Sequence, residues 1–241
     1  MMKQNIRIRE TRIKLVTDIE THNLQNFILK ERLLLEDYIR RKPYFLTSLE
    51  PLPVKSGPTI VKMMAKAALI SGVGPMAAVA GTISELSLHH LMDKGSKHTI
   101  VDNGGDIAFI NDRKITIGLY AGDSPLSGEI GFRFKTSKKP RGVCTSSGTV
   151  GHSISFGRAD AVTVFADRAS VADALATSIA NAANGKKDNE AVENALEKAE
   201  DFRDHFNGVL VIVGENAGII GRIPRLVKTD KKVTIGELWD V

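Results

Sequence analysis

The stretch DAVTVFADRASVADALATSIAN, residues 160–181, places a predicted strand directly before a predicted helix. Ala161–Ala166 is a short, mostly apolar run, which is typical of a strand inside a sheet. From Ser170 to Ala183 the pattern changes to that of a helix. A sheet strand followed by a helix is consistent with a layered fold of helices and sheet.

The rest of the chain alternates between helical spacing and short strand-like runs. Residues 6–15 alternate apolar and charged side chains, which predicts a β-hairpin. Further helices are predicted over residues 23–42, 59–70, 75–92 and 189–206, and further strands over 99–101, 107–110, 115–120, 130–134, 209–213, 219–220 and 233–235. These elements predict the α+β class and a single domain over residues 1–241.

Composition and charge narrow the classes of function. The formal net charge is +5, but Lys and Arg are spread along the chain and aromatic residues make up only 5%, so we expect no nucleic-acid partner. No stretch approaches the roughly 20 apolar residues of a membrane span, and the N-terminus has no apolar signal-peptide core. One cysteine cannot form an intramolecular disulfide. We therefore expect a cytoplasmic protein that does not enter a membrane.

A pair of glycines separates two strand-like runs in VDNGGDI, residues 101–107. Gly104 and Gly105 relax the steric limits on the backbone, so a ligand can approach closely between Asn103 and Asp106. A tight turn explains the same residues equally well, because Asn-Gly and Gly-Asp are common turn pairs. Both interpretations stay open on these residues alone.

A second polar segment is GVCTSSGTVGHS, residues 142–153. Its residues are mostly small, and many carry a hydroxyl, so we expect a loop that presents amides and hydroxyls to an anion rather than a core strand. A structural, hydroxyl-rich turn is the alternative. The candidate site residues in this segment are Cys144, Thr145, Ser146, Ser147, Gly148 and His152.

Cys144 is the only thiol of the chain. Oriented amides in the polar segment and the nearby Arg141 guanidinium would lower the pKa of the thiol and favour the reactive thiolate. The alternative is a buried, inert cysteine, which is the usual state of a lone Cys.

Asp173 and Thr177 lie four residues apart, so their oxygens share one face of the predicted helix. A carboxylate and a hydroxyl in this arrangement suit Mg²⁺, which binds few protein oxygens and completes its octahedron with water and phosphate. The alternative is a capping box from Ser170 to Asp173, in which the carboxylate returns to the cap amide.

These segments, taken together and in order, resemble the motifs of the ApbE-type FAD:protein FMN transferases. The segments are VDNGGDIAF, the CTSSG loop and DAVTVFADRASVADALATSIAN. The similarity is stronger to a prokaryotic ApbE-like family, abundant in methane-producing archaea, in which VGPMAAVAG, NGGD, CTSSGTVGHS and ADAVTV recur. The resemblance covers roughly residues 32–184. It implies a layered, T-fold-related α+β fold with helices packed on a mainly antiparallel sheet.

The resemblance also implies cofactors and roles for residues. Asp173 and Thr177 would ligate Mg²⁺ together with a backbone carbonyl, and the pyrophosphate of FAD would lie on that metal while a target Ser or Thr leaves with FMN. The sequence Asn103–Asp106 would line the flavin side. Ser147 and Gly148 would line the phosphate side, after Thr145 and Ser146 in the same loop. The paired-histidine loop of the transferases is shortened here, and His152 is the one histidine left in it.

Three functions stay open. The first is a Mg²⁺-dependent site for FAD or FMN that binds the flavin nucleotide or transfers FMN. The second is a sulfur-handling protein of homocysteine formation from sulfide, which the family resemblance implies, with Cys144 as a persulfide carrier that passes sulfur to an iron–sulfur or sulfurtransferase component. The third is a non-catalytic partner subunit. The apolar helix predicted over residues 75–92 packs either on its own sheet or against a second copy in a homo-oligomer.

Overall fold

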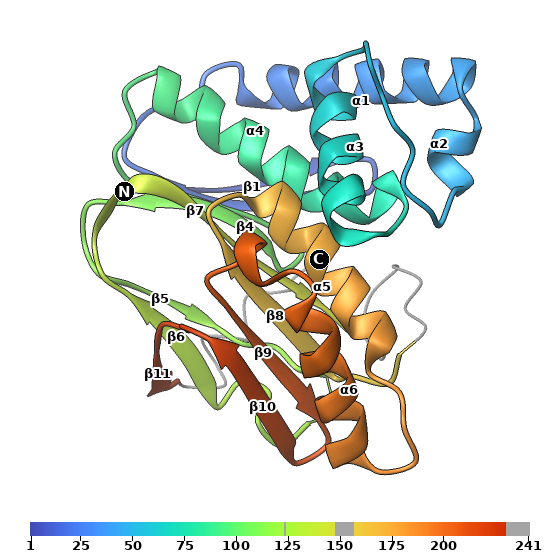
Figure 1. Cartoon of the computed structure of the whole chain (residues 1–241). Helices are drawn as coiled ribbons and strands as arrows, with labels where there is room; N and C mark the ends of the chain where they lie inside the picture. Colours follow the sequence, from blue (N-terminus) through green and yellow to red (C-terminus); the bar gives the residue numbers. More distant parts are fainter. Residues whose placement is uncertain (123, 148–156, 230–241) are drawn as a thin grey trace.

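An eight-stranded antiparallel sheet runs through the molecule, and the long helices cover one of its faces (Figure 1). The structure is a computed structural model and describes residues 1–122, 124–147 and 157–229. Along the large sheet the strand order is β1-β2-β3-β4-β7-β8-β9-β10, and a second sheet has the order β11-β6-β5. All neighbouring strands in the described part are antiparallel, which confirms the predicted α+β class.

The elements follow the chain in the order that their numbers give. The strands are β1 (Met2–Ile8), β2 (Thr11–Thr17), β3 (Thr99–Asn103), β4 (Asp106–Asn111), β5 (Ile115–Gly118), β6 (Ile130–Phe134), β7 (Ser137–Ser146), β8 (Ala161–Ala166), β9 (Gly208–Val213), β10 (Asn216–Gly221) and β11 (Arg225–Lys228). The helices are α1 (Leu24–Arg41), α2 (Tyr44–Thr47), α3 (Thr59–Ser71), the 3₁₀ turn η1 (Pro75–Ala78), α4 (Val79–Asp93), α5 (Ala169–Ala182), α6 (Asp188–Glu200) and the 3₁₀ turn η2 (Arg203–His205).

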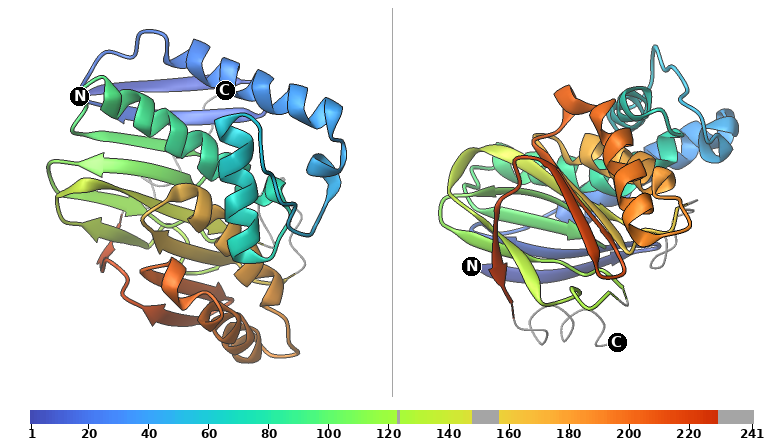
Figure 2. Two further views of the ribbon diagram at one scale, coloured as in Figure 1. Left: turned by 45° about the horizontal axis from the view of Figure 1, so that its top comes forward. Right: turned by 60° about the horizontal axis from the view of Figure 1, so that its bottom comes forward.

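Two apolar cores lie on opposite faces of the large sheet, because successive side chains of a strand point to opposite faces. One core lies between the sheet and helices α1, α3, α4 and α5. The other lies between strands β4, β7, β8 and β9 and the small sheet. The two further views in Figure 2 show the helices gathered on one side of the large sheet and the small sheet on the other.

Strand β7 corrects the prediction that residues 142–153 form a loop. Its backbone is paired on both sides, with β4 and with β8. One of the small residues that suggested a loop, Gly142, is explained by packing against α5, because a Cβ atom there would lie 2.5 Å from the Ala169 Cα. Residues 148–156 lie outside the described part of the chain.

Helix α4 packs on its own sheet, which answers the question of where the apolar segment over residues 75–92 is buried. It contacts β3, β4 and α5, and every residue from Gly81 to Leu88 is buried. Within the described residues, no single helix is long and apolar enough to cross a membrane. The pair Thr59–Ser71 and Pro75–Asp93 reaches that length only when taken together, and it bends by 107°.

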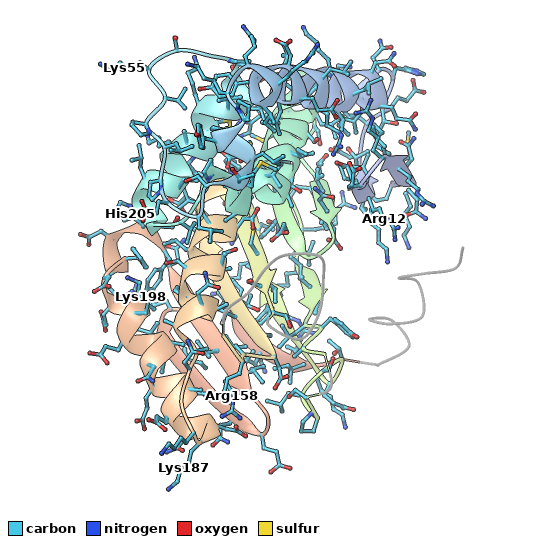
Figure 3. All side chains as sticks on the ribbon, turned by 90° about the vertical axis from the view of Figure 1, so that its right-hand side faces the viewer. Arg12, Lys55, Arg158, Lys187, Lys198 and His205 are labelled. Atoms are coloured by element: carbon cyan, nitrogen blue, oxygen red, sulfur yellow. The ribbon has the colours of Figure 1, made fainter. Side chains whose placement is uncertain are left out.

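Several predicted boundaries differ from the structure. The helix predicted over 189–206 ends at Glu200 and is followed by η2, and the strand β11 has no counterpart in the sequence-based prediction. The strand predicted over 233–235 lies outside the described residues. Arg12, Lys55 and Arg158 lie at different places on the side of the molecule that Figure 3 shows, in keeping with the absence of a basic block in the sequence.

Helices α4 and α5 cross at Gly81. A Cβ atom added there would lie 2.4 Å from the Ala169 carbonyl oxygen and 2.7 Å from the Asp173 Cβ. No side chain other than the hydrogen of glycine fits this crossing, so the first turns of the two helices are in direct backbone contact.

The variant Gly81→Ala tests this contact. In an ordinary helix interior the change stabilises by about 1 kcal/mol, because alanine has the higher helix propensity. Here the added methyl group must push α4 away from α5, so we expect a lower free energy of unfolding in urea, by about 1–3 kcal/mol. The control Ala80→Gly should lose only the propensity difference of about 1 kcal/mol. A Gly81→Ala variant that is more stable than the parent chain would contradict the tight crossing.

Candidate functional site

The predicted site residues that the structure describes come from β3, β4, β7 and α5, and most of them meet where α4 and α5 begin. Asp106 on β4 lies directly opposite Cys144 on β7. The carboxylate of Asp173 accepts a hydrogen bond from the Gly81 amide on α4, with an N–O distance of 2.8 Å. Asn103, at the end of β3, donates from Nδ2 to the Ala80 carbonyl oxygen at 3.3 Å. Three distant parts of the sequence are thereby brought to the N-terminal end of α4.

Asp173 does not form the capping box that its spacing from Ser170 allowed. Helix α5 has no side-chain cap of its own. Instead, the carboxylate of Glu85 on α4 accepts from the Ser170 amide at 2.9 Å and from its hydroxyl at 2.7 Å. Asp173 is therefore free of the local capping role and points its carboxylate across to α4, where it caps the Gly81 amide.

Two carboxyl groups face this point and repel each other. Burial raises the pKa of Asp173 to about 7, although hydrogen bonds from the Gly81 and Ala80 amides oppose the shift. Burial also raises the pKa of Asp106 well above its usual value, and the negative charge of Asp173 raises it further. Such a pair of carboxyl groups favours the binding of a proton or a cation.

Residues Asn103–Asp106 form a tight turn, and the space beside its two glycines is empty of described residues. Gly104 and Gly105 have φ angles of 71° and 101°, which favour glycine, and an added Cβ on either would meet no atom within 4 Å. The Ser84 hydroxyl holds the turn by donating to the Asp106 carbonyl oxygen at 2.7 Å. The turn is therefore fixed in position, and the space beside its glycines is free of the described chain.

Thr177 lies one turn after Asp173 on α5. It is the only residue from Ala169 to Ala180 that is not buried. Thr177 is therefore the partly accessible residue of this stretch of α5. It lies on the same helical face as Asp173.

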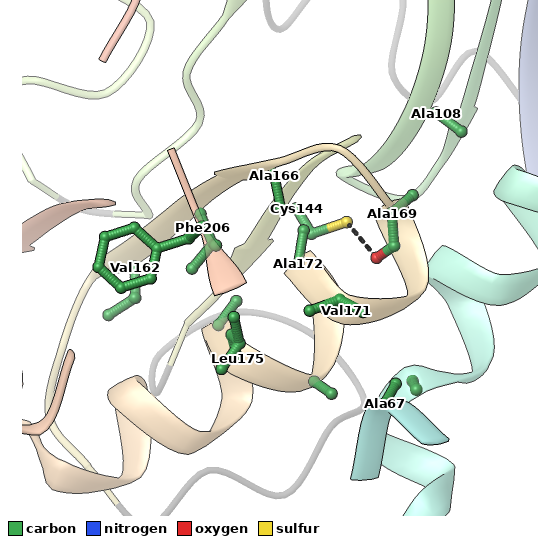
Figure 4. Close-up of a cluster of buried hydrophobic side chains, with 14 of the residues drawn as sticks. Ala67, Ala108, Cys144, Val162, Ala166, Ala169, Val171, Ala172, Leu175 and Phe206 are labelled. Carbon is green, nitrogen blue, oxygen red and sulfur yellow. Dashed lines mark hydrogen bonds between the residues drawn. The ribbon is translucent and has the colours of Figure 1, made fainter. Parts of the chain in front are cut away.

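Cys144 is fully buried, and its surroundings overturn the expected lowering of the thiol pKa. The thiol donates to the Ala169 carbonyl oxygen at a distance of 3.3 Å (Figure 4). Burial raises the pKa of the Cys144 thiol well above its usual value, and the nearby carboxyl groups of Asp106 and Asp173 raise it further. Arg141 lies three residues away on the opposite face of β7, where its guanidinium stacks on Phe109.

The other residues of the predicted polar segment do not join Asp106, Cys144 and Asp173. Thr145 points to the opposite face of the sheet from Cys144 and pairs with the Thr163 hydroxyl at 2.9 Å. Ser146 and Ser147 are partly buried at the end of β7. Gly148 and His152 lie outside the described residues.

The oxygens of Asp173 and Thr177 suit a hard cation that binds few protein ligands. In the part of the chain that is described, no group of three or more His, Cys, Asp or Glu side chains is arranged to hold a metal. Asp173 and Thr177 would therefore supply two oxygens, and the remaining positions would go to backbone, water or ligand oxygens, as Mg²⁺ permits.

Sequence analysis missed two residues of the site, Ser84 and Glu85. Both lie in the middle of α4 and are buried, although they are polar. The signal in the sequence is Glu85, the one charged residue between Gly81 and Leu88 in a mostly apolar segment, because a buried carboxylate needs a partner. The identity of that partner, at residues 168–170, was not visible without the fold.

Relatives with similar sequences span almost the whole chain. A family model described as "AbpE bacteria" matches residues 2–217. A UPF0280 protein from Methanothermobacter thermautotrophicus is 67% identical over 98% of this chain and 92% of its own length. A UPF0280 protein from Methanocaldococcus jannaschii is 50% identical over 99% of this chain and 98% of its own length.

Solved structures with low sequence identity share the fold. The apo form of the flavinyl transferase ApbE from Pseudomonas stutzeri matches with a TM-score of 0.57 at 13% identity, covering 98% of this chain and 97% of that one. A variant of the flavin transferase ApbE from Vibrio cholerae matches with a TM-score of 0.50 at 14% identity, over 95% and 97% of the two chains. The chain therefore belongs to the archaeal ApbE-like family that includes the UPF0280 proteins.

Proposed function

We propose that this protein binds FAD together with Mg²⁺ at Asp173 and Thr177 and transfers FMN to a hydroxyl group of a partner protein. The observation that carries the proposal is the position of Asp173. Its carboxylate lies at the crossing of α4 and α5, close to Asp106, and one turn from the partly accessible Thr177.

The charges at this point fit a divalent cation. Asp106 and Asp173 bring two carboxyl groups together in a partly buried place, and a cation between them and a diphosphate would offset both sets of negative charge. When bound, Mg²⁺ supplies charge neutralisation at the diphosphate as it is cleaved. The chain's own contribution is to hold Asp173 and Thr177 on one rigid helical face.

The Asn103–Asp106 turn fits the flavin side of the same ligand. Its two glycines leave open space next to Asp106, and the Ser84 hydroxyl fixes the turn. In the proposed reaction the acceptor oxygen forms a bond to the FMN phosphorus, the phosphoanhydride bond breaks, AMP leaves, and the hydroxyl proton passes to water. The names of the two solved transferases agree with this reaction class, although their low identity supports the fold alone.

Thermal melts with Asp173→Asn test the proposed site. Asparagine keeps an oxygen that can accept from the Gly81 amide but removes the charge that a cation needs. For the parent chain we expect Mg²⁺ and FAD together, at about 100 times the dissociation constant, to raise the melting temperature by about 5–10 °C. Asp173→Asn should abolish that rise.

The exposed Asp204 in η2 offers a matched control. Asp204→Asn should keep the full rise in melting temperature. A parent chain that FAD and Mg²⁺ do not stabilise, or an Asp173→Asn variant that keeps the rise, would contradict the proposed site.

The surroundings of Cys144 disfavour the alternative function of sulfur carriage. A persulfide carrier needs an accessible thiol that ionises readily, whereas the Cys144 thiol is buried, is hydrogen-bonded to the Ala169 carbonyl oxygen, and has a raised pKa. We therefore assign it no catalytic role in FMN transfer.

Alkylation by iodoacetamide at pH 8 checks this assignment. Because the reagent reaches Cys144 only when the structure opens, we expect the native protein to react at least about 100-fold more slowly than the protein unfolded in guanidinium. The unfolded chain is its own control for intrinsic thiol reactivity. A native rate close to the unfolded one, or a persulfide on Cys144 after treatment with sulfide and a mild oxidant, would restore the sulfur-carrier function.

A further inference from the structure

Glu85 is a buried carboxylate on α4 that forms hydrogen bonds with the first turn of α5 and with the residue before it. Only 3% of the residue is exposed. Its Oε2 accepts from the Ser170 amide at 2.9 Å and from the Ser170 hydroxyl at 2.7 Å. Its Oε1 accepts from the Arg168 Nε at 2.9 Å. Both oxygens of Glu85 are therefore used to hold the start of α5.

The same two helices are joined a second time, in the opposite direction. Asp173 in α5 accepts from the Gly81 amide in α4 at 2.8 Å. Gly81 and Glu85 are one turn apart on α4, and Ser170 and Asp173 are one turn apart on α5. Neither helix has a side-chain cap from its own N-cap residue. In each helix, a backbone amide of the first turn donates instead to a carboxylate of the other helix.

The packing leaves the first turn of α5 little freedom if one of these bonds is lost. The Ala169 carbonyl oxygen lies against Gly81 on one side, and the Ala169 Cα lies against Gly142 on the other. Removal of Glu85 would leave the Ser170 amide without an acceptor and Arg168 without its ion pair. We expect the turn to reorient, and Asp173, three residues further on, to move with it.

We propose that Glu85 is a positioning residue: through Ser170 and Arg168 it sets the place of the Asp173 carboxylate at the N-terminus of α4. The part of this proposal that concerns ligand affinity rests on the proposed function. The part that concerns the position of Asp173 rests on the two sets of hydrogen bonds alone.

Amide hydrogen exchange of the ligand-free protein tests the positional part. The reporter is the Gly81 amide, which exchanges only when its bond to Asp173 opens. Glu85→Ala should speed exchange at Gly81 at least about tenfold more than at the Val211 amide in β9, a fully buried strand paired on both sides, because local opening is separate from global unfolding. Glu193→Ala, a matched change at an exposed position of α6, should leave exchange at both amides as in the parent chain.

Glu85→Gln keeps the test decisive should Glu85→Ala fail to fold. Glutamine retains one oxygen for Ser170, but its amide group cannot accept from Arg168, so the exchange rate at Gly81 should rise by a smaller factor. The proposal is overturned if the Gly81 and Val211 amides respond equally to these changes, since Glu85 then contributes to global stability alone.

Binding of FAD with Mg²⁺, measured by calorimetry, tests the part that concerns affinity. Because supporting residues around metal ligands typically change affinity by about 10- to 100-fold, Glu85→Ala should weaken Mg²⁺-dependent binding by that factor while Glu193→Ala leaves it unchanged. If the parent chain binds no FAD with Mg²⁺, the proposed function fails, and the exchange rates at Gly81 still decide whether Glu85 positions Asp173. Unchanged affinity in Glu85→Ala, beside a parent chain that binds, would overturn the affinity part.

Discussion

The contact between the first turns of α4 and α5 is the constraint on which the rest of the site depends. The two backbones touch because residue 81 is glycine, and each helix start is capped by a carboxylate of the other, Asp173 for α4 and Glu85 for α5. Caps of this kind stabilise a helix start by about 1 kcal/mol each, which is small beside the core. Their larger effect is geometric, because they fix one carboxylate at a place where the sheet brings up a second.

That second carboxylate is placed by the register of the sheet. Asp106 begins β4 and lies opposite Cys144 on β7. Because strand side chains alternate between faces, this register directs Asp106 and Cys144 toward α5 and directs Thr145 to the opposite face, where it pairs with Thr163. A shift by one residue would exchange the two sets. The cluster therefore depends on the pairing of β4 with β7 as much as on the helices.

Elements with a regular pattern of apolar residues could be predicted from the sequence. Elements whose structure depends on residues far away in the sequence could not. Ala161–Ala166 is a strand with the predicted bounds, and helix α5 differs by one residue at each end. Residues 142–146 of β7 were predicted as a loop because they are mostly small and several carry a hydroxyl. Pairing on both sides makes them a strand all the same. The capping box failed for a similar reason, since Glu85 supplies the acceptor that the local sequence assigned to Asp173.

The raised pKa values of Asp106 and Asp173 make the stability of the fold depend on pH. Both carboxyl groups have a folded-state pKa above the unfolded value, so the folded state binds more protons than the unfolded state as pH falls toward 4. Their contribution to stability is therefore full below the unfolded pKa and is lost as pH rises toward about 7, the raised pKa of Asp173. At neutral pH the pair opposes folding. Two such groups at one point lower stability at neutral pH, and a cation bound at the Mg²⁺ site proposed above would offset that cost.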